Sequence, residues 1–273
     1  FGWEDINIMI PKIIHYCWFG GNPMPELAKR CLDSWKSHCP DYEIMEWNES
    51  NFDLNTNAYV SEAYKAKKWA FITDYVRLAA LEEYGGVYMD TDVEVLAPLD
   101  EFLKNKAFSG FEGYDLIPTG IMASEKGNRW IKLLKEYYND KHFIRDDGSY
   151  DMTTNVATIT EITKANYPIK LNNTYQNLGD VTFYPCEYFC PKDYRTKMMT
   201  YYGEKTVTIH HFNGSWLSEE ERNILELSDE IRKKYGKFIA TLVKSILELR
   251  QARKEGGFAK ALELLKIKIR RRI

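Results

Sequence analysis

The sequence lacks several features that would assign a protein quickly to a class. No stretch of its 273 residues approaches the roughly 18–20 uninterrupted apolar residues of a membrane-spanning helix, which argues against an integral membrane protein. The start of the chain has no basic segment followed by an apolar one, so we expect no secretion signal. We interpret residues 1–8 as an addition before a natural start at Met9.

Cysteine is scarce and follows no metal-finger pattern. None of the five cysteines forms a Cys-x-x-Cys pair, and Cys186 and Cys190 have no neighbouring histidine at zinc-finger spacing. We therefore expect reduced, buried thiols in a cytosolic protein. The glycines form neither a P-loop nor a Gly-x-Gly-x-x-Gly fingerprint, so the common phosphate-binding loops have no support.

The net charge is small but unevenly distributed. It is −3 overall, whereas residues 245–273 carry nine Lys or Arg against three Glu. This tail therefore has a net charge of +6 and leaves −9 on residues 1–244. Nucleic-acid binding needs basic surface along a binding face, which an acidic body does not offer, so we expect no nucleic-acid partner.

The chain contains an alternation of strand-like and helix-like segments. Runs of β-branched and aromatic residues are typical of buried strands, and apolar residues at helical spacing, ended in one case by Gly85-Gly86, are typical of helices. This alternation predicts an α/β fold rather than a β-sandwich. We expect strands at residues 10–19, 42–47, 87–89, 93–96, 107–111, 181–184 and 206–210, and helices at 25–38, 58–67, 70–84, 129–138, 156–165 and from 218 onward.

Two aspartates, Asp90 and Asp92, follow the expected strand at 87–89 with one residue between them. Like charges at the edge of an apolar sheet repel each other and raise each other's pKa unless a cation lies between them. A hard divalent ion with oxygen ligands resolves this conflict. An Asp-x-Asp pair is also common in solvated turns, so this pattern needs support from other residues.

Asp74 and Arg77 supply part of that support. They lie three residues apart on the expected helix at 70–84 and therefore share one face. A surface ion pair contributes under about 1 kcal/mol, but the apolar neighbours of this pair predict a buried helix, where an isolated ion pair is unfavourable. Gly85-Gly86 allows a tight turn that directs this face to the end of the next strand. The combination predicts a polar site.

Residues 70–92 resemble the DXD sugar-binding region of glycosyltransferase family 32 and the corresponding region of the large clostridial glucosylating toxins. Three other segments are similar to this family in the same order: IPKIIHYCWFGG at 10–21, CPDYEIMEWN at 39–48 and IHHFNGSW at 209–216. The resemblance spans residues 10–216 and leaves 218–273 unmatched. It implies a GT-A fold, a Rossmann-like mixed sheet that binds a nucleotide sugar and is flanked by helices.

The resemblance also implies roles for individual residues. Trp18 corresponds to the residue that stacks on the nucleotide base, and Asp74 with Arg77 to the pair that binds the donor sugar. Asp90 corresponds to the aspartate that contacts the ribose or donor sugar and the metal, and Asp92 to the direct ligand of Mn²⁺ or Mg²⁺. Such an ion acts as a Lewis acid on the leaving diphosphate, and Arg77 offers fixed donors to sugar hydroxyls.

The closing motif is expected to complete the metal site. His210 and His211 are adjacent on a strand and face opposite sides, so only one of them reaches the ion, and the family alignment favours His211. Ser215 and Trp216 correspond to residues that contact the diphosphate, and the Trp216 indole N–H can donate to a phosphate oxygen. Tyr88, just before the Asp-x-Asp motif, either lines the donor pocket or belongs to the core.

Other polar residues are weaker candidates. Asp115, in a loop, and Asn155, at the start of a helix, are candidates for facing the acceptor, although helix capping explains Asn155 equally well. Lys12 and His15 lie in the first expected strand and are interpreted as structural.

Residues 218–273 are expected to form a helical extension of a catalytic domain at 9–217. Residues 238–249 carry a broad apolar face, Gly256-Gly257 are expected to break the helix, and Lys and Arg accumulate after them. This segment forms either a helix packed on the body or a basic amphipathic helix on an anionic membrane surface, with a dimer contact as a third alternative. The membrane alternative suits a lipid-linked acceptor.

Sequence and resemblance together predict a metal-dependent, retaining glycosyltransferase that moves a hexose from a nucleotide sugar to a glycan or lipid-linked acceptor. We expect UDP-galactose or UDP-glucose as the donor, with GDP-mannose as the alternative, and front-face attack, because no carboxylate is assignable as a nucleophile. The implied setting is bacterial surface polysaccharide synthesis, such as capsule, in the cytoplasm or peripherally at the inner face of the cell membrane. The alternatives are a toxin-like protein glucosyltransferase and a nucleotide-sugar-binding protein without transfer activity.

Overall fold

The computed structural model describes residues 9–194, 196, 198–214 and 219–270. The chain divides into two compact units, residues 1–212 and 213–273. Among the residues just given, the strands lie in the first unit, and the second unit is helical.

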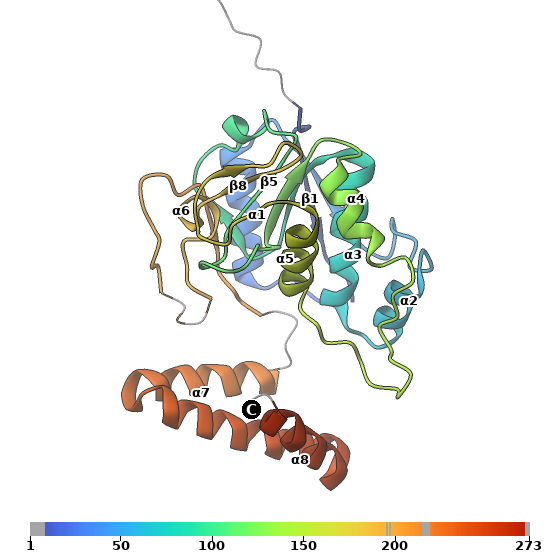
Figure 1. Cartoon of the computed structure of the whole chain (residues 1–273), viewed down its shortest axis with the longest axis vertical. Helices are drawn as coiled ribbons and strands as arrows, with labels where there is room; N and C mark the ends of the chain where they lie inside the picture. The colour runs from blue at the N-terminus through green and yellow to red at the C-terminus, as the bar shows by residue number, and fades with distance from the viewer. Residues whose placement is uncertain (1–8, 195, 197, 215–218, 271–273) are drawn as a thin grey trace, which may run out of the picture. The chain divides into compact units, whose positions relative to one another are not determined.

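A seven-stranded mixed sheet forms the centre of the first unit (Figure 1). Its strand order is β2-β1-β3-β6-β5-β8-β7; β1 is parallel to β2 and β3, β5 is parallel to β8, and the other pairs are antiparallel. A separate antiparallel pair consists of β4 (Val93–Val95) and β9 (Thr208–His210). The strands of the large sheet are β1 (Ile13–Cys17), β2 (Glu43–Trp47), β3 (Gly86–Met89), β5 (Ala107–Gly110), β6 (Ile121–Ser124), β7 (Gln176–Asn177) and β8 (Thr182–Tyr184).

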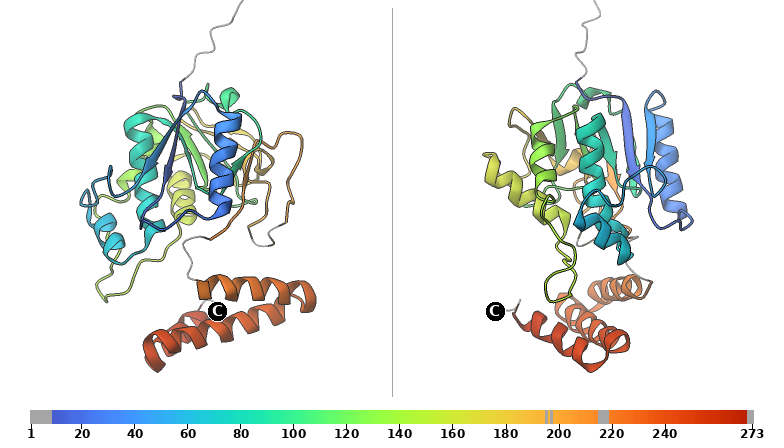
Figure 2. Two further views of the ribbon diagram at one scale, coloured as in Figure 1. Left: turned by 180° about the vertical axis from the view of Figure 1, so that it is seen from behind. Right: turned by 90° about the vertical axis from the view of Figure 1, so that its right-hand side faces the viewer.

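Helices cover both faces of this sheet (Figure 2). One face carries α1 (Glu26–His38), the 3₁₀ helix η1 (Asp100–Phe102) and the short α6 (Cys186–Phe189). The opposite face carries α2 (Ala58–Lys65), α3 (Trp69–Tyr84), α4 (Arg129–Glu136) and α5 (Asn155–Asn166). A sheet between two helical layers is the α/β class that the sequence predicted, and that prediction is confirmed.

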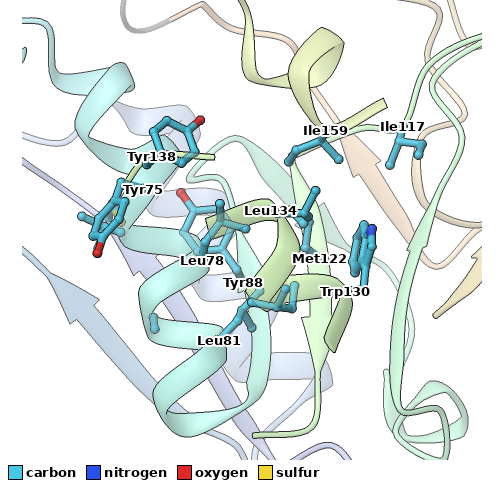
Figure 3. Packing of buried hydrophobic residues seen from close by; sticks show 14 of the residues in the cluster. Tyr75, Leu78, Leu81, Tyr88, Ile117, Met122, Trp130, Leu134, Tyr138 and Ile159 are labelled. Carbon is cyan, nitrogen blue, oxygen red and sulfur yellow. The ribbon is translucent and has the colours of Figure 1, made fainter. Parts of the chain in front are cut away.

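Each face of the sheet has its own apolar cluster, because successive side chains of a strand point to opposite sides. On β1, Ile14 and Tyr16 join the α1 side, where the rings of Tyr16 and Trp35 lie 5.8 Å apart. Cys17 joins the other side, where α3 contributes the fully buried Leu78 and Leu81 (Figure 3). The burial of α3 agrees with the apolar pattern of its sequence.

The turn from α3 into β3 depends on Gly85 and Gly86. Their φ values are +71° and +103°, a region that residues with a Cβ rarely adopt. A Cβ on Gly86 would lie 2.6 Å from the Ile13 carbonyl oxygen, and one on Gly85 would lie 2.7 Å from the Lys126 nitrogen. The chain therefore reverses tightly here, and the first turns of α3 lie toward the carboxyl end of β3.

The second unit is a pair of helices, α7 (Glu219–Tyr235) and α8 (Lys237–Arg270), that pack against each other with Gly236 between them. Helical structure is assigned from Lys237 to Arg270, but Gly257 has a φ of +71°, outside the right-handed helical region, so the backbone is interrupted where the sequence predicts a break. Within the residues that the structure describes, none of the helices combines the length and apolar character needed to cross a membrane.

Candidate active site

The carboxyl ends of β2, β1 and β3 meet at one edge of the sheet, because these three strands are parallel neighbours. Trp18, Glu49 and the pair Asp90 and Asp92 lie in the segments that follow them. The loop before β6 reaches the same edge, where the Asp90 N–H donates to the Gly120 carbonyl at 2.9 Å. Open α/β sheets bind ligands outside the carboxyl ends of their strands, so this edge is the candidate active site.

Arg77 is the centre of a buried polar network at this edge. One guanidinium nitrogen lies 3.3 Å from Asp74 Oδ1 and 3.3 Å from Asp90 Oδ1. Another donates to the Thr119 carbonyl at 2.6 Å, and the Tyr88 ring lies 4.5 Å from the guanidinium carbon. Because a single side chain contacts both aspartates and the backbone, it holds Asp74 and Asp90 in a fixed relation. The predicted pair Asp74 and Arg77 is thus in contact with Asp90 as well.

The Asp74 carboxyl lies in an environment of low polarity. Burial raises its pKa to about 7, although the Arg77 guanidinium opposes this shift. Asp90 raises the pKa further, whereas the amide of Asn155, the first residue of α5, lowers it. The weak candidate Asn155 thus lies beside the Asp74–Arg77 pair, with its Oδ1 accepting a hydrogen bond from the Tyr138 hydroxyl at 3.2 Å.

Tyr88 belongs to the core rather than to the surface of a pocket. Its side chain is 1% exposed, and burial raises the pKa of its hydroxyl well above the usual value. The hydroxyl donates to Asp90 Oδ1 at 3.0 Å. Of the two interpretations of Tyr88, the structure supports a core position. The hydrogen bond from its hydroxyl also orients Asp90.

Asp90, Asp92 and His210 form a group that could hold a metal ion: each offers one ligand atom, and these atoms lie within 4.8 Å of one another. Nε2 of His210 is 3.3 Å from Asp92 Oδ1. Burial lowers the pKa of His210, but the charges of Asp92 and Asp90 outweigh this effect and raise it overall. Two carboxylates and one imidazole are suitable ligands for Mn²⁺ and related divalent cations.

The position of His211 differs from the alignment-based expectation. Its Nε2 lies 2.7 Å from Glu94 Oε2, and its backbone N–H donates to the Asp92 carbonyl at 2.9 Å. The two histidines face opposite sides, as adjacent strand residues must, and the pairing of β9 with β4 turns His210 toward Asp92. The third member of the group is therefore His210, and the expectation for His211 is corrected.

Of the residues predicted to contact the nucleotide base or the diphosphate, only Trp18 lies in the described part of the chain. Ser215 and Trp216 fall outside the described residues. Trp18 follows β1, and its indole N–H donates to the Asn22 carbonyl at 2.7 Å. A hollow of about 540 Å³ adjoins this loop and is lined by Gly20, Gly21, Asn22, Glu49, Tyr64, Lys67 and Trp69.

The contribution of the segment before β6 to the site was not predicted from the sequence. Thr119 accepts from Arg77, and Gly120 packs directly against the imidazole of His210, where a Cβ would lie 2.8 Å from Nδ1. The available signal was a glycine followed by the apolar residues 121–123, but the strand they belong to, Ile121–Ser124, is only four residues long. Glu112 and Cys190 also lie near His210 and were not predicted.

The sequence of this chain is similar to those of several known proteins. Residues 25–109 match the family described as glycosyltransferase sugar-binding region containing DXD motif. Inositol phosphoceramide mannosyltransferase 3 of Schizosaccharomyces pombe is 30% identical over 141 residues, which cover 47% of this chain and 37% of that protein. The uncharacterized glycosyltransferase L373 of Acanthamoeba polyphaga mimivirus is 26% identical over 202 residues, covering 68% of this chain and 77% of that protein.

Among solved structures, the PaToxG glycosyltransferase is similar with a TM-score of 0.42 and 19% identity, covering 58% of this chain and 70% of that one. The chain spans about a third of the length of the yeast mannosyltransferase it matches. The matched proteins are glycosyltransferases, and the family match includes the Asp-x-Asp motif at the candidate site. The predicted resemblance is confirmed: the chain is similar to DXD-motif glycosyltransferases of the family 32 type.

Proposed function

We propose that the chain transfers a hexose from a nucleotide sugar to a glycan or lipid-linked acceptor, with a divalent cation at the donor diphosphate and retention of the anomeric configuration. The observation that carries this proposal is the convergence of Asp90, Asp92 and His210 with the Asp74–Arg77 pair at one sheet edge. Cation ligands and a rigid polar network beside them match the needs of a charged donor and its sugar.

Each side chain has a distinct task in this proposal. Asp90, Asp92 and His210 would hold Mn²⁺ or Mg²⁺, which when bound supplies Lewis-acid stabilisation of the leaving diphosphate. Arg77 fixes the orientation of Asp74 and Asp90, so that their carboxyl groups meet the donor without reorganisation. Trp18 and the adjacent hollow would receive the nucleotide base.

The donor stays within the predicted alternatives. UDP-galactose and UDP-glucose are our first candidates. GDP-mannose is the second, and it is supported by the name of the yeast relative, an inositol phosphoceramide mannosyltransferase. That name also describes a lipid acceptor, which agrees with the proposal of a lipid-linked acceptor here.

The C-terminal helices are proposed to attach the enzyme to an anionic membrane surface. Phe238, Ile239, Leu242 and Ile246 are exposed apolar residues on α8, and the segment that follows is rich in Lys and Arg. An apolar face combined with a basic one is typical of helices that lie at a membrane interface. Such a location suits an enzyme of bacterial surface polysaccharide synthesis, which remains our proposed setting.

Thermal-shift binding of UDP-Gal, UDP-Glc, UDP-GlcNAc and GDP-Man, each with Mn²⁺ and with EDTA, tests the proposal. We expect one donor to raise the melting temperature, and we expect EDTA and Asp92→Ala to abolish that rise. Asp33→Ala, which changes a carboxylate that is 74% exposed on α1, is the matched control and should behave as wild type. No shift with any donor would contradict the proposal, and binding without turnover of the bound donor would favour the non-enzymatic alternative.

A further inference from the structure

A second group of metal-binding side chains lies next to the Asp90–Asp92–His210 group. Glu112, Cys190 and His210 each offer one ligand atom, and these atoms lie within 4.8 Å of one another. Glu112 follows β5, Cys190 follows α6, and His210 is the last residue of β9. Three segments far apart in the sequence therefore bring a carboxylate, a thiol and an imidazole together.

The fold fixes each of these segments by hydrogen bonds. The Glu112 N–H donates to the Leu116 carbonyl at 2.8 Å, which closes the loop after β5. The Cys190 N–H donates to the Cys186 carbonyl at 2.9 Å. The Thr208 hydroxyl donates to the Phe189 carbonyl at 2.8 Å and so joins β9 to the end of α6. The backbone around the three side chains is held in place, as a preorganised site requires.

The group is buried and carries ligands of a different kind from those of the DXD motif. Glu112 is 6% exposed and Cys190 is 2% exposed. Thiolate, imidazole and carboxylate are the ligands that Zn²⁺ selects, whereas Mg²⁺ and Mn²⁺ favour oxygen.

We propose that Glu112, Cys190 and His210 form a binding site for a thiophilic divalent cation such as Zn²⁺, and that this site shares His210 with the DXD aspartates. On binding, the Cys190 S–H bond breaks, a sulfur–zinc bond forms, and the proton passes to solvent. Three protein ligands leave a fourth position of the tetrahedral ion for water. Zn²⁺ also binds nitrogen and sulfur ligands more tightly than Mn²⁺ does.

Sharing His210 has a functional consequence, which rests on the proposed function. An ion held by Glu112 and Cys190 competes for the imidazole that completes the Asp90–Asp92 group. Zn²⁺ is therefore an inhibitor of Mn²⁺ binding that acts through Cys190, a residue outside the proposed donor site.

Cadmium is a direct probe of this site, because a cadmium–thiolate bond absorbs in the ultraviolet. We expect Cd²⁺ added to the EDTA-treated full chain to produce this band, Cys190→Ala to abolish it, and Glu112→Gln to weaken Cd²⁺ binding at least about tenfold. Cys39→Ala removes another buried thiol, which lies in the α1-side cluster, and should keep the band. A band of unchanged strength in Cys190→Ala would overturn the proposal.

Competition with Mn²⁺ provides the second readout. We measure free Mn²⁺ by electron paramagnetic resonance while Zn²⁺ is added, in the absence of any sugar. Removing Cys190 should raise the Zn²⁺ concentration needed to release Mn²⁺ at least about tenfold; an unchanged concentration would overturn the proposal. If circular dichroism shows that Cys190→Ala does not fold, Glu112→Gln takes its place, and it should likewise raise the Zn²⁺ concentration needed to release Mn²⁺.

Different results would contradict the proposed transferase function and the proposed thiophilic site. A cadmium band without any Mn²⁺-dependent donor shift would contradict the proposed transferase function and leave the thiophilic site standing. A donor shift that is equally sensitive to Zn²⁺ in the wild type and in Cys190→Ala would contradict the thiophilic site alone.

Discussion

Gly120 packs against the imidazole of His210, and the ring fits there because Gly120 has no side chain. A Cβ at this position would lie 2.8 Å from Nδ1 and 2.9 Å from Cε1. The carbonyl of Gly120 also accepts from the Asp90 N–H at 2.9 Å. One glycine therefore sets the positions of two members of the proposed cation site.

Gly120→Ala is expected to displace His210 and weaken Mn²⁺ binding at least about tenfold, as changes next to metal ligands commonly do. Isothermal calorimetry with Mn²⁺ measures this effect. Gly110→Ala is the matched control, since its Cβ would crowd the Tyr184 carbonyl at 3.2 Å but not a histidine. Equal Mn²⁺ affinity in both variants would show that the contact does not position His210.

The two adjacent histidines should respond differently to removal. We expect His210→Ala to lower metal-dependent turnover more than about 100-fold, because the cation loses a direct ligand. His211→Ala loses only a partly exposed contact with Glu94, which contributes under about 1 kcal/mol, and should keep most of the activity. The reverse order of effects, measured as initial rates with saturating Mn²⁺, would restore His211 as the ligand.

Arg77 should matter for stability as well as for donor binding. Arg77→Ala leaves the buried Asp74 and its neighbour Asp90 without their shared cation, which is expected to cost about 3–5 kcal/mol of unfolding free energy. Arg77→Lys keeps the charge but loses the planar fork, so its loss should be smaller. Urea unfolding measures both. Arg129→Ala, whose side chain is 71% exposed, is the control and should change stability by less than about 0.5 kcal/mol.

His15 should make stability depend on pH. The Trp47 indole N–H donates to its Nδ1 at 3.2 Å and its Nε2 lies 2.7 Å from the Gly85 carbonyl oxygen, so the neutral ring with a proton on Nε2 satisfies both partners. Burial lowers its pKa from 6.5 to about 4, although the Gly85 carbonyl opposes this shift. Between these values the unfolded chain binds the proton and the folded chain does not.

The free energy of unfolding should therefore fall as pH drops from 6.5 toward 4, by about 3 kcal/mol from this residue. Urea unfolding at several pH values measures the slope. His15→Asn retains an acceptor but cannot titrate, and it should flatten the slope in this window. His142→Asn, at a side chain that is 63% exposed, should leave the slope as in the wild type. A wild-type slope in His15→Asn would contradict the assignment.

The C-terminal segment is expected to bind anionic vesicles. Residues 258–273 carry six Lys or Arg against one Glu, and each basic residue near an anionic surface contributes about 1 kcal/mol. A chain ending at Gly257 should sediment less with phosphatidylserine vesicles than the full chain. Vesicles of neutral lipid are the control, and added salt should reduce the difference. Equal sedimentation of both chains would end the membrane proposal.

Much of the fold was predictable from local sequence pattern. The helices α1 and α3 and the strands β1 to β3 have clear periodicity or clear stop signals, and the structure places them within a few residues of the expected ranges. The four residues of β6 are too few to show a period, yet this strand lies in the middle of the sheet and brings Gly120 to the site. A short central strand is specified by its neighbours rather than by its own residues.

Part of the candidate site was predictable because several of its residues lie close together in the sequence. Asp74, Arg77, Asp90 and Asp92 fall in one segment of 19 residues, so spacing and resemblance sufficed. The choice between His210 and His211 depends on the pairing of β9 with β4, where a slip of one residue exchanges the two faces. Glu112 and Cys190 approach His210 from segments far away in the sequence. Motifs that recognise metal ligands by their spacing along the chain therefore do not detect this group.

The pairing of β4 with β9 also has a consequence for biosynthesis. The contact between Glu94 and His211 joins residues 117 positions apart, so the pair forms only when most of the catalytic unit has left the ribosome. A nascent chain, which emerges from its N-terminal side, acquires both aspartates long before the histidine that accompanies them. Transcripts or proteolytic products that end before residue 208 would carry a complete DXD motif and still be unable to assemble the three-residue cation group.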